Sequence, residues 1–245
     1  MAGYDTANYI YAVYQGADAK YGTPGFWVRY FSPCPNTPFP VNAVKESQAA
    51  WDSGGGHIGP ISSPGPARIS ANSSADGFAD GQTFAASLQQ ASDNVSQLRL
   101  PSNGHMYCWL DMEPGDVLNS NYWNGWAHSL NTWNWKRQGI YPLYAALYTR
   151  TCKDNGCQAA TGKVLPEYVC FGIWSQQPQR QGSVSHPPTW AADSCAHCIL
   201  LLPPPTLLWQ FTIAKEFGDN VDVDLDVAAP GINYSSYTFY LTSRP

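Results

Sequence analysis

Two acids stand at the end of one apolar run of the sequence. Asp111 and Glu113 close the segment that starts at Met106, and Pro114 follows them directly. Because side chains alternate along a β-strand, both acids share one face and lie about 6.6 Å apart along it. Proline cannot donate to a sheet ladder, so we expect the acids at the carboxyl end of a strand. Such a pair suits cleavage of a glycosidic bond, in which one carboxyl protonates the leaving oxygen and another stays ionised, although two solvated acids beside a loop would give the same pattern.

More acids follow other apolar runs. Asp5 ends the first run, and Asp222, Asp224 and Asp226 alternate with apolar residues in the last one. The inward faces of barrels are mostly branched and apolar, and a buried, unpaired carboxylate is costly. We therefore expect these acids to meet water, a partner or a substrate. The alternative for the last run is a solvated edge strand outside any barrel.

Aromatic and basic residues near the predicted strand ends are further candidates. Tyr30, Trp174 and Trp209 could form the floor of a sugar subsite, or could pack in the core. Arg29 could pair with an acid of the site, or could be a structural arginine. The five histidines show no metal-ligand spacing with the acids, so we expect neither a metal nor a cofactor.

The elements that must position these residues follow from hydrophobic periodicity. Eight runs rich in apolar, aromatic and β-branched residues predict strands. They are Ala2–Asp5, Gly25–Phe31, His57–Ser62, Met106–Asp111, Tyr141–Tyr148, Tyr168–Trp174, Leu207–Phe211 and Val221–Val227. Helical spacing of apolar residues predicts helices over residues 44–51, 84–98 and 122–133.

The alternation of strands and helices favours parallel strands joined by right-handed crossovers. We predict an α/β fold, a single (β/α)8 barrel of TIM type with irregular or missing later helices. In such barrels the active site lies at the carboxyl ends of the strands. No internal repeat or linker is visible, so residues 1–245 are expected to form one domain, with a Pro- and Cys-containing insertion near residues 175–206.

Cysteine spacing and composition limit the possible cellular compartments and the possible binding partners. Two local cysteine pairs, at 152 and 157 and at 195 and 198, favour loop disulfides or free thiols over a zinc site. Charged residues are only 13% of the chain, and aromatic residues are 14%. A surface of small polar and aromatic residues suits stacking against sugar rings. The net charge of -5 without a Lys/Arg run argues against nucleic acid, and no apolar run reaches the roughly 20 residues of a membrane span. The N-terminus also lacks a charged-then-apolar leader, so export would need a removed signal or another route.

The order of several motifs resembles a known family. The segments Gly3–Thr6, Val28–Ser32, Glu46–Gly56 and Tyr107–Glu113 look like the glycoside-hydrolase-like barrel family called domain of unknown function 1906. That family is related to the glycoside hydrolase family 25 lysozymes, which cut peptidoglycan. Leu208–Thr212 followed by Val223–Asp226 is similar to the closing signature of those lysozymes. The resemblance covers most of residues 2–230 apart from the insertion.

The resemblance implies roles for particular residues. Glu113 would be the proton donor and Asp111 its partner on the same strand. Asp5 and Asp224 would complete an acidic ring, and Asp222 competes with Asp224 because the Val-Asp repeat permits two registers. Expected substrate contacts, besides Asp222, are Tyr30, Trp174, Trp209, Gln210 and Arg29.

The function that these implications favour is hydrolysis of a polysaccharide. We expect a secreted or phage-borne glycosidase, extracellular or associated with the cell wall, that cuts the β-1,4 bond beside N-acetylmuramic acid in bacterial peptidoglycan. The alternative is a non-catalytic glycan-binding or wall-binding barrel of a phage or secreted assembly. A chitinase-like or other glycanase is a third possibility.

Overall fold

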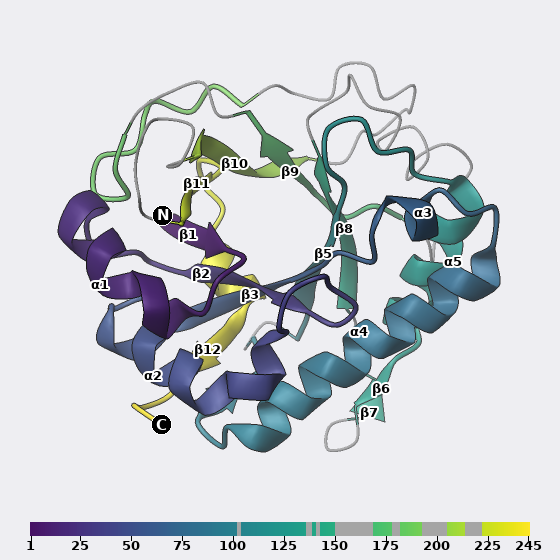
Figure 1. Ribbon diagram of the computed structural model, residues 1–245, viewed down its shortest axis with the longest axis horizontal. Helices are drawn as coiled ribbons and strands as arrows, with labels where there is room; N and C mark the ends of the chain where they lie inside the picture. Colours follow the sequence, from purple (N-terminus) through teal and green to yellow (C-terminus); the bar gives the residue numbers. More distant parts are fainter. Residues whose placement is uncertain are drawn as a thin grey trace.

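Eight strands form a closed barrel in the computed structural model (Figure 1). The structure describes residues 1–101, 104–135, 139–140, 143–149, 169–177, 182–192, 205–213 and 222–245. The barrel strands are β1 (Ala2–Thr6), β2 (Trp27–Phe31), β3 (His57–Ser62), β5 (Met106–Asp111), β8 (Leu143–Thr149), β9 (Ile173–Gln176), β10 (Thr206–Ile213) and β11 (Asp224–Ala228). Their order is β2-β1-β11-β10-β9-β8-β5-β3, and β3 pairs back to β2. Each predicted run contributes one strand, which confirms the predicted barrel of TIM type.

The described α-helices, and a 3-10 helix among them, lie outside the strands and fall between Ile10 and Asn131 (Figure 1). They are α1 (Ile10–Tyr21), the 3-10 helix η1 (Phe39–Asn42), α2 (Ala43–Asp52), α3 (Pro66–Ile69), α4 (Ser74–Asn94) and α5 (Ser120–Asn131). Among the described residues, no α-helix follows Asn131, in agreement with the prediction of irregular or missing later helices. Helix α1 was not predicted, and α4 ends before Leu98, which lies in the short strand β4 (Leu98–Arg99).

The direction of the last barrel strand differs from the prediction. Strand β11 is antiparallel to both neighbours, β1 and β10, whereas an all-parallel barrel was expected. Only residues 214–223 connect β10 to β11. A crossover between parallel strands needs a dozen or more residues, so a connection of this length favours an antiparallel return. The first residues of β11 therefore lie at the carboxyl end of β1.

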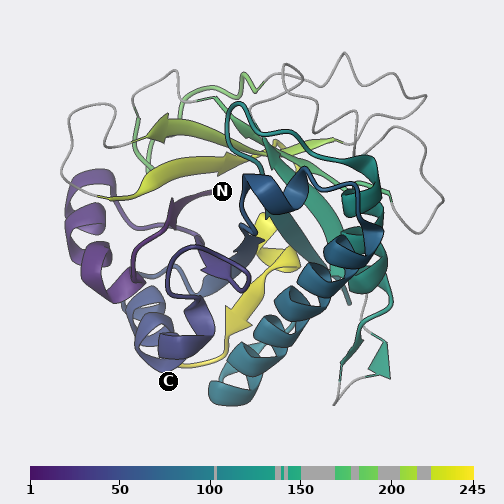
Figure 2. The ribbon, with the colours of Figure 1, turned by 45° about the vertical axis from the view of Figure 1, so that its right-hand side comes forward.

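Aromatic side chains fill the amino-terminal end of the barrel. The 3-10 helix η5 (Tyr234–Tyr237) places Tyr234 beneath the strands, where its hydroxyl accepts a 2.9 Å hydrogen bond from Trp109 Nε1. Beside it, Tyr144 and Phe171 stack with centroids 4.0 Å apart. Strand β12 (Phe239–Leu241), the yellow arrow in the lower middle of Figure 2, then pairs antiparallel with β3 and β4 beside the amino-terminal part of β3. Polar side chains are thus left to the opposite end.

Some predictions lie outside the described residues. These include the two cysteine pairs at 152/157 and 195/198, and most of the insertion near residues 175–206, so the single domain over residues 1–245 stays a prediction. The described cysteines, at 34, 108 and 170, are free. A short hairpin, β6 (Asn134–Trp135) with β7 (Gly139–Ile140), was not predicted. None of the described helices has the length and apolar character needed to cross a bilayer.

Candidate functional site

Polar side chains from seven strands gather at the carboxyl end of the barrel. Most inward positions at this level carry an acid, an amide or a tyrosine, in contrast to the aromatic layer at the other end. We call this group the acidic mouth; it consists of Asp5, Tyr30, Asp111, Tyr148, Gln176, Gln210 and Asp224, together with Glu113 just beyond β5. Period-two alternation explains most of the set, because Asp5, Tyr30, Asp111, Tyr148 and Gln176 are the last inward positions of their strands. Asp224 is instead the first residue of the antiparallel strand β11.

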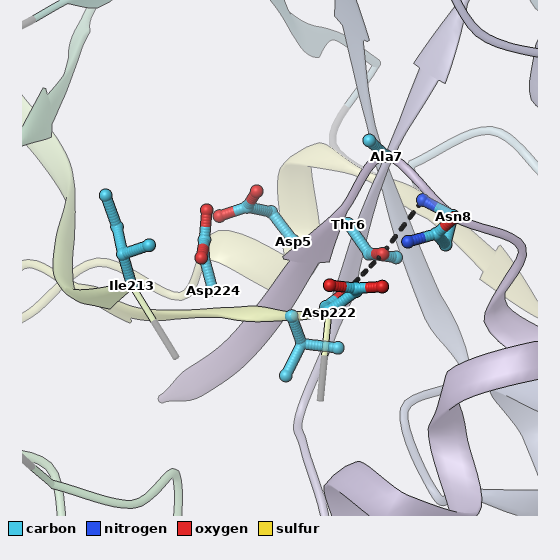
Figure 3. A pocket seen from close by; sticks show the side chains of 8 residues that line it. Asp5, Thr6, Ala7, Asn8, Ile213, Asp222 and Asp224 are labelled. Carbon is cyan, nitrogen blue, oxygen red and sulfur yellow. Dashed lines mark hydrogen bonds between the residues drawn. The ribbon is translucent and has the colours of Figure 1, made fainter. Parts of the chain in front are cut away.

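One side of the mouth is a hydrogen-bonded group around Gln210. Its Nε2 donates to Asp5 Oδ2 at 3.2 Å and to Asp224 Oδ2 at 2.9 Å. Its Oε1 accepts from the Tyr148 hydroxyl at 3.0 Å. Asp5 and Asp224 are register partners of β1 and β11, and their carboxyl groups point toward one another in Figure 3. The amide therefore holds two acids of neighbouring strands together.

A pocket of about 360 Å³ opens beside these two acids. Asp222 lies on its wall, exposed and outside the strand, with its carbonyl accepting from Thr6 Oγ1 at 2.8 Å (Figure 3). The same Thr6 oxygen accepts from the Asn8 amide at 3.0 Å. Of the two registers that the Val-Asp repeat permits, the structure pairs Asp224 with Asp5 and leaves Asp222 at the rim.

The other side of the mouth carries the Asp-x-Glu pair. Asp111 is only 5% exposed, and Tyr30 donates its hydroxyl to Asp111 Oδ2 at 3.4 Å. Glu113 is exposed, and its Oε2 accepts from Gln176 Nε2 at 3.2 Å. A turn fixes the Glu113 backbone, because its amide donates to Asp116 Oδ2 and its carbonyl accepts from the Asp116 amide, both at 3.0 Å. The two acids thus share a strand end and differ in their access to solvent.

Burial and mutual repulsion raise the pKa values of these acids. Loss of hydration, reinforced by the Glu113 charge, raises the pKa of Asp111 to about 7. The pKa of Glu113 is raised by loss of hydration and by Asp116, although the Gln176 hydrogen bond opposes the shift. The pKa of Asp5 lies well above its usual range because loss of hydration and the neighbouring Asp226 both disfavour its charged form. Carboxyl groups that hold protons near neutral pH are therefore available at the mouth.

Asp226 lies one inward position below Asp224 and is fully buried. Trp174 Nε1 donates to Asp226 Oδ1 at 2.8 Å, so this indole forms the floor of the mouth rather than an exposed platform. Burial raises the pKa of Asp226 to about 8. The sequence placed Asp226 on the same strand face as Asp224, but it was not among the expected site residues.

Two expected substrate contacts lie elsewhere in the structure. Arg29 is completely buried on the outer face of β2, where its Nε is 2.5 Å from Glu46 Oε2 of α2. Trp209 is 2% exposed and packs in the outer core, with Nε1 donating to the Gln177 carbonyl at 3.1 Å. Both side chains alternate with inward residues, and neither reaches the acidic mouth. Of the two alternatives for Arg29, a site residue or a structural arginine, this position fits the structural arginine.

Two residues of this region, Tyr148 and Gln176, were not predicted from the sequence, and Asp226 was noted in the last run but was given no role. Tyr148, Gln176 and Asp226 each stand on an inward face of their strand. A strict count of alternate positions could have found Tyr148 at the end of its run and Asp226 two residues after Asp224. Gln176 was missed because its strand was expected to end at Trp174. The described residues hold no group of three or more His, Cys, Asp or Glu that could bind a metal ion.

Comparison with known proteins identifies relatives by fold. No protein-family model matches the sequence, and no curated protein matches it. An uncharacterised protein of B. stearothermophilus has a similar structure, with a TM-score of 0.68 and 17% identity over 97% of this chain and 99% of that one. The Tat-secreted protein Rv2525c of Mycobacterium tuberculosis, in complex with L-tartrate, gives a TM-score of 0.52 and 11% identity over 94% and 96% of the two chains. Its complex with HEPES gives a TM-score of 0.52 and 12% identity over 93% and 95%. At these identities the similarity is one of fold.

Proposed function

We propose that this barrel is a glycoside hydrolase that cuts bacterial cell-wall peptidoglycan at the β-1,4 bond beside N-acetylmuramic acid. The observation that carries the proposal is the gathering of Asp5, Asp111, Glu113 and Asp224 at the carboxyl end of one closed barrel. Glycosidic cleavage needs a carboxylic acid and a carboxylate around one bond, and this mouth supplies both.

Glu113 is the proton donor in this proposal. It is the exposed acid of the Asp-x-Glu pair, so a leaving glycosidic oxygen can reach it. Because its pKa is raised, a larger fraction of the Glu113 carboxyl is protonated at a given pH than in an ordinary glutamate. The Gln176 amide and the turn at Asp116 hold its side chain and backbone in place.

Asp224, and Asp111 where it is ionised, stabilise the positive charge that develops on the sugar ring. Asp224 accepts a hydrogen bond from Gln210 and faces the pocket, where a sugar ring has room. Asp111 lies deeper and carries charge only above about pH 7. The Tyr30 and Tyr148 hydroxyls stay neutral, since burial and the neighbouring acids raise the pKa of both phenols, and they serve as hydrogen-bond donors.

The polymer and the compartment are part of the proposal. The sequence resemblance to peptidoglycan-cutting lysozymes supports a wall polymer, and the Tat-secreted neighbour supports action outside the cytoplasmic membrane. A mouth of acids, amides and phenols suits hydroxyl-rich ligands, and the neighbour's complex with L-tartrate, a small hydroxy acid, agrees with such a preference. No cofactor enters the proposed reaction.

The test is digestion of purified cell walls. Wild-type protein should clear a wall suspension and release reducing ends, with muropeptides identified by mass spectrometry. Glu113→Gln should lower the rate by at least about a hundredfold, because it removes the acid while keeping the Gln176 contact. Asp52→Asn removes one negative charge from the far surface pair with Arg244 and should leave the rate unchanged.

Other outcomes separate the alternatives. Wild-type protein that pulls down with walls yet releases no fragment would support the non-catalytic wall-binding module. Release of fragments from chitin but not from peptidoglycan would identify another glycanase. A Glu113→Gln protein that digests walls at the wild-type rate, with an unchanged melting temperature, would remove Glu113 from the proposed role.

A further inference from the structure

Asp5 of the acidic mouth forms a carboxyl pair with Asp226 directly beneath it. Asp226 is fully buried inside the barrel, and it interacts with the carboxyl group of Asp5 on the neighbouring strand. Glycine at position 3 is the register partner of Asp226, so no side chain of β1 separates the acid from the space next to Asp5. Two adjacent carboxyl groups in such a place cannot both ionise without a large electrostatic cost.

The two carboxyl oxygens of Asp226 differ in their hydrogen bonds. Oδ1 accepts from Trp174 Nε1 at 2.8 Å. Oδ2 is buried and has no donor among the described residues. A proton held between Oδ2 and the Asp5 carboxyl would satisfy this oxygen, because a protonated carboxyl is a donor as well as an acceptor. The same proton would remove the repulsion between the two acids.

We propose that Asp226 is a positioning residue, which shares one proton with Asp5 and so fixes the orientation of the Asp5 carboxyl at the acidic mouth. The inference rests on the proposed function for the role of Asp5 in turnover. Held from below by Asp226, Asp5 presents Oδ2 to Gln210, which in turn holds Asp224 and is held by Tyr148. The shared proton stays within the pair, and no covalent bond changes.

The surroundings of the pair favour retention of this proton. The described titratable groups that act on the two acids are themselves acids or phenols: Asp224, Asp111, Tyr30, Tyr148 and Tyr234. Additional negative charge at Asp224 or Asp111 disfavours a second charge below. Burial acts in the same direction, and it raises the pKa of both Asp226 and Asp5.

The experiment is a carbon-13 NMR titration of full-length protein labelled at the aspartate carboxyl carbons. In the wild type, a resonance that disappears in Asp5→Asn should keep the chemical shift of a protonated carboxyl at neutral pH. In Asp226→Asn, the amide can still accept from Trp174 and can donate to an ionised Asp5. The titration midpoint of Asp5 should therefore fall by more than about one pH unit.

A kinetic measurement separates positioning from a merely structural role. Asp226→Ala, which removes both contacts, should lower kcat on wall fragments by about tenfold to a hundredfold, as expected for a misplaced group, with a much smaller change in KM. Asp226→Asn, which can still hold Asp5 by donating to it, should retain more of the wild-type kcat than Asp226→Ala. Asp52→Asn, which replaces an acid by an amide at the surface, should leave both the Asp5 resonance and kcat unchanged.

Each result bears on one claim. A wild-type spectrum in which the Asp5 carboxyl is ionised at neutral pH would overturn the shared proton, whether or not walls are digested. An Asp226→Ala protein with wild-type kcat and KM would overturn the positioning role. A wild type that retains the protonated Asp5 resonance but digests no wall polymer would count against the proposed hydrolase and not against the shared proton.

Discussion

Asp111 and Glu113 stand two residues apart on one strand end, yet the barrel gives them different properties. Asp111 points into the mouth beneath Tyr30 and is 5% exposed, whereas Glu113 lies at the rim in contact with Gln176. The loss of hydration is the main cause of the raised pKa in both acids. The deeper acid has the pKa of about 7, so depth within the mouth decides which acid is neutral.

The raised pKa of Asp111 predicts a pH dependence of stability. The unfolded chain releases this proton near pH 4, whereas the folded protein holds it to about pH 7. Between these limits the folded state binds more protons, so the free energy of unfolding falls as pH rises, by up to about 1.4 kcal/mol per pH unit for this group. Urea unfolding across this range measures the slope, and Asp111→Asn should make it shallower.

A matched surface variant provides the control for this slope. The pKa of Asp52 is lowered by its hydrogen bonds to Arg244, so Asp52 is ionised in both states above pH 4. Asp52→Asn should therefore keep the wild-type slope in this range. An Asp111→Asn protein that also keeps the wild-type slope would contradict the assignment of a neutral Asp111 to the folded state.

The face of β2 on which Arg29 lies determines what its side chain contacts. Its neighbours Val28 and Tyr30 face the barrel interior, so Arg29 faces α2 and binds Glu46 in two places, through Nε at 2.5 Å and Nη2 at 3.0 Å. Glu46 also accepts from the Ile10 amide at the start of α1. The arginine thus joins β2 to two helices and supports the barrel wall.

At the scale of elements, α4 and α5 pack unusually closely. Gly77 and Gly81 of α4 face α5, and Gly125 of α5 faces α4. A Cβ atom at Gly125 would overlap the Ser74 carbonyl oxygen, and one at Gly77 would overlap the Tyr122 carbonyl oxygen. These obstacles are backbone atoms, so the helices would have to move apart to admit a methyl group.

Alanine in place of Gly125 should therefore destabilise the protein. We expect a loss of about 1–3 kcal/mol or more in the free energy of unfolding, because the cost of overpacking exceeds the helix propensity gained. Gly16 of α1 is the matched control, since it is exposed within a helix. Gly16→Ala should stabilise by up to about 1 kcal/mol. Denaturant unfolding measures both, and a stabilised Gly125→Ala protein would refute the close helix contact.

At the scale of the whole molecule, the two ends of the barrel have opposite chemistry. Aromatic rings close the amino-terminal end around Tyr234, and acids with their amide and phenol partners line the carboxyl end. The C-terminal segment supplies part of the closed end, because η5 adds Tyr234 to it and β12 pairs with β3 beside it. The rings of Trp109 and Trp174 lie between this aromatic plug and the site, since Trp109 donates to Tyr234 and Trp174 donates to Asp226. We expect these two rings to keep the acids in place when Tyr234 is truncated.

Truncation of the plug tests this expectation. Tyr234 is fully buried, so Tyr234→Ala should cost about 3–5 kcal/mol through the cavity that it leaves. Tyr234→Phe should cost less, about 1–3 kcal/mol, because it removes only the acceptor for Trp109. Well below its melting temperature, either variant should keep the wild-type pH dependence of wall digestion. A shifted pH profile would show that the two ends are coupled.

Much of the barrel could be predicted from the sequence, because its strands are local features. Alternation and β-branched composition mark each run independently of the rest of the chain, and all eight runs became barrel strands. The strand ends were less certain: β9 was expected to end at Trp174 but continues to Gln176, which contacts Glu113. Helix α1 was missed, and it shows the weakest amphipathic pattern of the longer helices.

The sequence by itself determined which residue types could meet, since Asp5, Asp111, Glu113 and the last-strand acids all occupy alternate positions near strand ends. Only the tertiary structure decided the direction of β11, because strand direction depends on the connection to β10 and leaves the alternation pattern unchanged. The antiparallel direction brings Asp224 beside Asp5 and turns Asp226 down into the barrel. In a parallel strand Asp226 would lie toward the mouth and Asp222 deeper in the barrel. The path of the chain alone fixes which end of the strand meets the mouth.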